Sequence, residues 1–136
     1  AHCDESPRAA WEERGQMFVP VRQGYAKCST AIVSREAVVT ADPSIAKAAA
    51  GCGLDVLRIR EGFVELPGFS FGFLGGACGK LSRDTLAFAG DLRTHPDCAA
   101  IEAFLRSHGV FALSLCGGPL RDVGGILPLR EEEGAD

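Results

Sequence analysis

The sequence lacks any apolar run near the roughly 20 residues that a membrane-spanning helix needs, and it lacks an excess of positive charge. Its 136 residues carry 14 Lys and Arg against 18 Asp and Glu, for a net charge of −4. We therefore expect no membrane and no nucleic acid among its partners, because nucleic-acid binding depends largely on clustered positive charge. No basic-then-apolar segment opens the sequence, which favours a cytoplasmic protein over a secreted one.

The cysteines lack the spacings of metal and redox sites. Six of them are spread along the chain at intervals of 18 to 26 residues, with no C-x-x-C pair and no Cys/His cluster. Apolar residues make up 46% of the sequence, so a core can form without a disulfide framework. We predict reduced thiols, no metal site and no cofactor.

The charge is concentrated at the two ends. Residues 1–16 carry −2 and residues 130–136 carry −3, which leaves +1 for residues 17–129. This division predicts a charged head over 1–16, either poorly ordered or forming a short helix. A single α/β domain over 17–129 and an acidic, disordered tail over 130–136 follow it.

The domain contains two similar segments, offset by 48 residues. Val-Ser-Arg-Glu-Ala-Val-Val-Thr-Ala at 33–41 resembles Leu-Ser-Arg-Asp-Thr-Leu-Ala-Phe-Ala at 81–89. Each segment predicts two strands joined by a turn at Ser-Arg-acid, followed by a helix that begins after a proline and by a third strand at 55–59 or 110–115. In the second copy, Thr94 and Asp97 form a predicted capping box at the start of the helix. The fold class is thus α/β, with two β-β-α-β units, about 17–68 and 69–129, in mixed sheets with outer helices. The expected core comprises Ile32, Val38, Val39, Leu57, Ile59, Leu86, Phe88, Ile101, Phe104, Leu105, Leu113 and Leu115.

A glycine-rich segment, residues 66–80, lies between the units. It predicts either a glycine-bulged strand packing under Phe69, Phe71 and Phe73, or a pocket wall with Cys78 and Lys80 exposed at its rim. The candidate ligand-binding residues combine this wall with groups near other glycine pairs: Gly75, Gly76, Lys80, Cys116 and Asp122.

One set of residues could support cysteine chemistry. Backbone N–H groups around a glycine loop can stabilise a thiolate, which makes Cys78 the candidate nucleophile. His95 is the candidate base and Asp91 the acidic anchor for a small amidine or amide substrate.

Several motifs within residues 18–129 resemble an uncharacterised bacterial domain of unknown function, found largely in Firmicutes. They include Gly72-Phe73-Leu74-Gly75-Gly76, His95-Pro96-Asp97 and Gly124-Gly125-Ile126-Leu127-Pro128-Leu129. Members of that family are longer, and this chain resembles their C-terminal half. The family implies no established activity.

The repeated topology and the glycine pairs resemble, more weakly, the pentein fold, the five-module propeller of arginine deiminases. Pentein enzymes carry a cysteine nucleophile after a glycine pair near the chain end, whereas residues 124–129 hold the glycines and Pro-Leu without a cysteine. Non-catalytic penteins also exist, so the resemblance implies a pentein-like partial propeller without fixing an activity.

Three functional hypotheses remain open from the sequence. The first is a non-catalytic binding or assembly module that forms a homodimer through exposed sheet edges and has room for a small-molecule ligand. The second is the cysteine-dependent hydrolase or transferase. The third is a truncated fragment without a function of its own.

Overall fold

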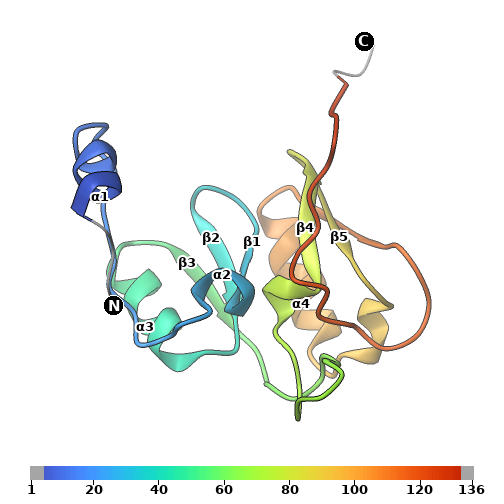
Figure 1. The fold of residues 1–136 in the computed structure, drawn as a ribbon. Coiled ribbons are helices and arrows are strands. Elements are labelled where there is room, and N and C mark those ends of the chain that lie inside the picture. The colour runs from blue at the N-terminus through green and yellow to red at the C-terminus, as the bar shows by residue number, and fades with distance from the viewer. Residues whose placement is uncertain (1–4, 133–136) are drawn as a thin grey trace.

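The computed structural model describes residues 5–132 and builds them around two three-stranded sheets (Figure 1). The first unit comprises β1 (Thr30–Ile32), β2 (Ala37–Thr40), α3 (Pro43–Gly51) and β3 (Asp55–Arg58). Strand β1 runs antiparallel to β2, and β3 runs parallel to β2 after the crossover through α3.

The second unit has the same order of elements and the same pairing directions. It comprises β4 (Cys78–Ser82), β5 (Thr85–Phe88), a 3-10 turn η2 (Leu92–Thr94), α4 (Cys98–Ser107) and β6 (Phe111–Ser114). Strand β4 is antiparallel to β5, with an irregularity between Lys80 and Ser82, and β6 is parallel to β5. The predicted α/β class with mixed sheets is confirmed.

Three shorter elements complete the described chain: α1 (Glu5–Glu12), α2 (Ala26–Ser29) and the 3-10 turn η1 (Leu74–Gly76). Helix α1 stands apart from both sheets (Figure 1), within the head for which a short helix was one expectation. Residues 133–136 of the predicted acidic tail lie outside the described residues. Within 5–132, no helix is long and apolar enough to cross a membrane.

The two main helices begin differently. Asp42 caps α3, because its Oδ1 accepts hydrogen bonds from the Ser44 and Ile45 backbone N–H groups at 2.8 and 2.9 Å, with Pro43 in the first turn. The predicted capping box at α4 is wrong. The Asp97 carboxylate instead accepts the Arg60 backbone N–H at 2.8 Å and pairs with its guanidinium. Helix α4 therefore starts at Cys98 without a side-chain cap.

Helix α4 joins the two sheets through one hydrophobic core. Its fully buried Ile101 and Leu105 share a cluster with Val39 of β2 and Phe88 of β5. At the C-terminal end of α4, His108 Nε2 lies 2.7 Å from Asp55 Oδ2 at the start of β3. The side chains that α3 buries lie outside this cluster, so α3 covers the opposite face of the first sheet.

Most of the predicted core is buried, but three residues are not. Ile32, Leu113 and Leu115 are all exposed, whereas Leu57 and Phe104 are partly buried against the core. Ile32 lies on β1, Leu113 lies on β6, and Leu115 directly follows β6. Both strands are at the edges of their sheets. The expectation failed because an apolar residue in a strand is buried only if something covers its face of the sheet.

Candidate functional site

The thiol of Cys78 lies in the core, not at a pocket rim as one of the expectations held. Its residue is only 5% exposed at the start of β4 and belongs to the central cluster. Burial raises the pKa of the Cys78 thiol to about 12, an effect that the charge of Lys27 only partly opposes. The nucleophilic form of cysteine is the thiolate, so this thiol is poorly suited to attack a substrate near neutral pH.

The ring of His95 is fixed in a neutral form. His95 is 2% exposed, and its Nδ1 accepts the Asp97 backbone N–H at 2.9 Å. Phe63 packs edge-on with a centroid distance of 5.5 Å. Burial is the main effect on its pKa and lowers it, although the charge of Asp97 opposes the shift. A neutral ring that accepts at Nδ1 carries its proton on Nε2, so it has no free lone pair with which to deprotonate a thiol.

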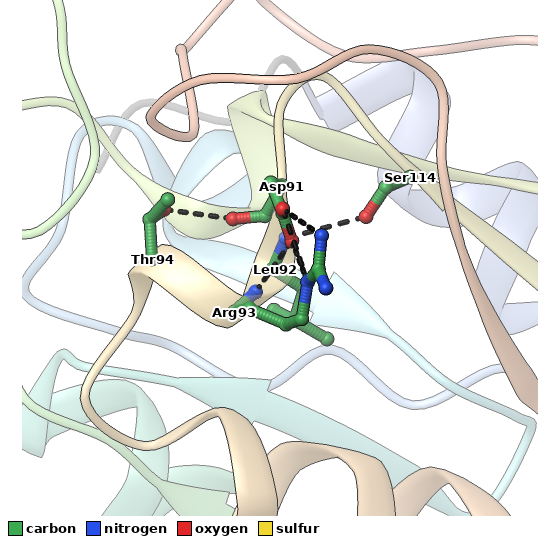
Figure 2. Close-up of polar contacts among 5 residues, drawn as sticks. All are labelled: Asp91, Leu92, Arg93, Thr94 and Ser114. Carbon is green, nitrogen blue, oxygen red and sulfur yellow. Dashed lines mark hydrogen bonds and ion pairs between the residues drawn. The ribbon is translucent and has the colours of Figure 1, made fainter.

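The carboxylate of Asp91 is occupied by its own turn (Figure 2). It accepts the Arg93 backbone N–H at 2.9 Å and forms an ion pair of 2.7 Å with the Arg93 guanidinium. The hydrogen bond from the Arg93 side chain is the main reason that the pKa of Asp91 is lowered. Asp91 and Cys116 line one hollow, whereas His95 lines another. The structure therefore does not bring Cys78, His95 and Asp91 together around one hollow.

The space beside the predicted ligand-binding glycines is instead occupied by other parts of the chain. A Cβ at Gly76 would collide with the Asp122 carboxylate, and one at Gly75 would meet the backbone carbonyls of Cys28 and Thr30. Asp122 accepts the Phe73 and Gly124 backbone N–H groups at 3.0 and 2.9 Å. The structure thus brings Gly75, Gly76 and Asp122 into one packed junction.

Lys80 and Cys116 lie away from that junction. The Lys80 ammonium donates to the carbonyls of Val33 at 2.8 Å and Arg83 at 2.6 Å, which fastens β4 to the first unit. Burial lowers the pKa of Lys80, and the nearby Asp84 opposes this. Cys116 is exposed after β6. Across residues 5–132, no three His, Cys, Asp or Glu side chains gather as a metal site would need.

Two hollows border the loop 69–73. A pocket wall within residues 66–80 was one expectation, but Cys78 and Lys80, the residues expected at its rim, line neither hollow. One is a crevice of about 280 Å³ beside the carboxyl ends of β2 and β3, lined by His95 and by Ser29. The Ser29 hydroxyl is buried and has no hydrogen-bond partner among the described residues. The other hollow, of about 770 Å³, has four aromatic residues in its lining and is called the aromatic hollow below. Its lining residues are Tyr25, Cys28, Leu66, Phe69, Ser70, Phe71, Phe73, Asp122, Val123 and Gly124.

A signal for the aromatic hollow was present in the sequence. Phe69, Phe71 and Phe73 alternate as in a strand, but Pro67-Gly68 places a turn directly before them. Gly68 has a positive φ of +87°, and the Phe69 N–H donates to the Leu66 carbonyl at 3.0 Å. The segment is a loop, so its alternate aromatics are not covered by a sheet partner.

The comparisons with known proteins identify a family. Residues 1–127 match DUF6873, a family of unknown function. The chain belongs to this family. The match begins at residue 1, so it includes the head, which the resemblance drawn from sequence motifs had left out. No curated protein and no solved structure matches this DUF6873 chain.

We predict that Cys78 is the least reactive of the described thiols in the native protein. Alkylation by iodoacetamide between pH 5 and 9, followed by mass spectrometry, should label the exposed Cys116 first and leave Cys78 unlabelled until urea unfolds the chain. Cys116 provides the internal control for an accessible thiol. Rapid labelling of native Cys78 near neutral pH would contradict this prediction and revive the cysteine-hydrolase hypothesis.

Proposed function

We propose that this chain is a non-catalytic, pentein-like assembly module that binds a second copy of itself through the exposed β6 side of its second sheet. The two units support a modular architecture, since each has an antiparallel strand pair, a helix and a third strand parallel to the second. The buried Cys78 thiol and the fixed His95 ring favour binding over cysteine catalysis.

One observation carries the proposal: equivalent faces of the two sheets differ in how far they are buried. Val39 pairs with Leu57 in the first sheet, as Ala87 pairs with Leu113 in the second. The first-sheet face, with Val39 fully buried, packs into the cluster that contains α4. On the second sheet, the corresponding face of β6 leaves Leu113 45% exposed and Phe111 61% exposed. An exposed apolar face of this kind typically marks an interface.

The contact within the chain indicates what covers such a face, namely the helix of a neighbouring unit. On α4, the side that carries His108 faces the first sheet, because His108 contacts Asp55. The two helices can be aligned by their buried residues, Ile45 and Ala49 in α3 with Ile101 and Leu105 in α4. Ala48 and Cys52 at α3 then correspond to Phe104 and His108 at α4. This side of α3 is small and uncharged, so α3 of a second copy can lie on the β6 face without burying an unpaired charge. The association is therefore head-to-tail.

The strand β6 also forms an open edge of its sheet. The proposed contact thus lies beside one of the exposed sheet edges through which the sequence predicted a homodimer.

A cytoplasmic location belongs to the same proposal. It is supported by the five cysteines of the described chain, which are all free, as is usual in reducing compartments.

Two charge substitutions test the head-to-tail arrangement. By sedimentation velocity, the unmodified chain should form species larger than a monomer that grow with concentration. Leu113→Glu removes the sheet surface and Ala48→Glu removes the helix surface, so each variant alone should be monomeric. Mixed one to one, the variants should form a dimer that does not grow further, because each retains one intact surface.

The control is Phe69→Glu, which changes an exposed aromatic residue outside both surfaces and should leave the assembly unchanged. If Leu113→Glu dissociates the assembly while Ala48→Glu does not, the sheets pair face to face and the helix assignment is wrong. A chain that stays monomeric at all concentrations overturns the assembly proposal.

A further inference from the structure

We infer that the aromatic hollow is a binding site for a quaternary ammonium group of a small molecule, with Asp122 as the counter-charge. This site is separate from the proposed assembly surface, because its lining contains no residue of β6 or α3. The two proposals can therefore fail independently.

The walls of the hollow are aromatic rings that remain open to solvent. Phe69 is 73% exposed and Tyr25 is 69% exposed. The Tyr25 and Phe73 rings stack with centroids 6.3 Å apart and an interplanar angle of 27°. The turn at Gly68 and the backbone hydrogen bond from Phe69 fix the start of the loop that carries Phe69. Exposing large rings in one place costs hydrophobic stabilisation, which is typical of a surface that binds something.

Asp122 gives the hollow its single formal charge. Its Oδ2 accepts the Phe73 N–H and its Oδ1 the Gly124 N–H, so the carboxylate is held in place beside the Phe73 backbone. The absence of side chains at Gly72 and Gly76 makes room for it. Each carboxylate oxygen retains capacity for a further contact. Within the described chain, Asp122 forms no ion pair with a lysine or arginine.

One basic group, Lys27, bonds to the backbone of a lining residue but does not itself line the hollow. The Lys27 ammonium donates to the Gly124 carbonyl at 2.7 Å and packs closely against Gly125. The other polar side chains of the lining, Cys28, Ser70 and Tyr25, include no cation. The hollow therefore combines aromatic faces, which carry partial negative charge, with one carboxylate, and this combination favours a cation over an anion or a neutral polar group.

The small number of charged hydrogen-bond acceptors in the lining favours a quaternary ammonium over a primary amine. A primary ammonium has three N–H donors and requires acceptors for each of them once it leaves water. The carboxylate is the only charged acceptor in the lining, and each of its oxygens already accepts one backbone N–H, which leaves less capacity for three further donors. A quaternary ammonium has no donors, and its methyl groups are suited to contact with Tyr25, Phe69 and Phe73.

The test compares choline with its uncharged isostere, 3,3-dimethylbutan-1-ol, in titrations followed by NMR of the full chain. Choline should bind about tenfold more tightly than the isostere, as expected for an exposed cation–π site with a nearby carboxylate. Phe69→Leu should weaken choline binding about threefold or more. Phe111→Leu, the same change at an exposed phenylalanine outside the hollow, should have no effect.

Three outcomes overturn the inference. They are equal binding of choline and the isostere, an equal effect of Phe69→Leu and Phe111→Leu, and the absence of choline binding. A further arm uses phosphatidylcholine vesicles. Vesicle binding without binding of free choline would assign the same chemistry to a lipid headgroup and reject the small-molecule ligand.

Discussion

Replacing Phe88 with alanine is expected to lower the free energy of unfolding by about 3–5 kcal/mol, the usual cost of removing a buried phenylalanine. Phe88 ends β5, is fully buried, and belongs to the cluster that contains both sheets and α4. Its backbone carbonyl accepts the Leu115 N–H at 2.9 Å, which leaves little freedom for the strand to close the cavity. Urea denaturation followed by circular dichroism measures the change.

The matched control is Phe111→Ala, the same substitution on the neighbouring strand β6. Phe111 is 61% exposed, so the cost in a monomer should be below about 1 kcal/mol, as is usual for surface positions. Both changes are made in the Ala48→Glu background, where the proposed assembly is absent. Because the core is shared between the units, both proteins should unfold in a single transition. Equal costs for the two substitutions would show that the β6 face is covered within the monomer.

The features that sequence could predict are local. The Ser-Arg-acid turns, the alternating strands and Asp42-Pro43 at the start of α3 each depend on residues close together in the chain. They predicted both β-β-α-β units and the mixed sheets. The Asp97 cap failed for the opposite reason. Its carboxylate binds Arg60, 37 residues away, and no local pattern records that competition.

The site residues show the same limit. Glycines indicate that something approaches the backbone closely, but they do not distinguish a ligand from another part of the chain. At Gly72 and Gly76 the approaching group is the Asp122 side chain. Asp122 is about as distant in the sequence as the two similar segments are from each other, so no local pattern reveals the contact. Cys78 was expected at a rim because its neighbours are glycines, yet its position as the first residue of β4 places it in the core. The pocket-wall alternative named the right segment, but Phe69, Phe71 and Phe73 were expected to pack in the interior, because strand-like alternation of apolar residues usually signals packing.

Gly75→Ala is expected to destabilise the protein by about 3 kcal/mol, at the upper end for adding a methyl group to a packed interior. A Cβ at Gly75 would lie 2.6 Å from the Cys28 carbonyl oxygen and would also collide with the Thr30 carbonyl. Both are backbone atoms at the junction of α2 and β1, so no side-chain rotation relieves the clash. The junction is anchored by the Ser29 N–H, which donates to the Tyr25 carbonyl at 2.9 Å. Urea denaturation again measures the effect.

Gly117→Ala is the control, because a Cβ at Gly117 meets nothing within 4 Å and its φ is not positive. It should change stability by less than about 0.5 kcal/mol. The Gly75 substitution also acts on the aromatic hollow, since the segment it displaces carries Tyr25 and Cys28. Choline binding should therefore weaken in Gly75→Ala under conditions where the variant remains folded, and stay unchanged in Gly117→Ala. If both variants are equally stable, η1 is not seated against the α2–β1 junction, and the rigidity assigned to that wall of the hollow is wrong.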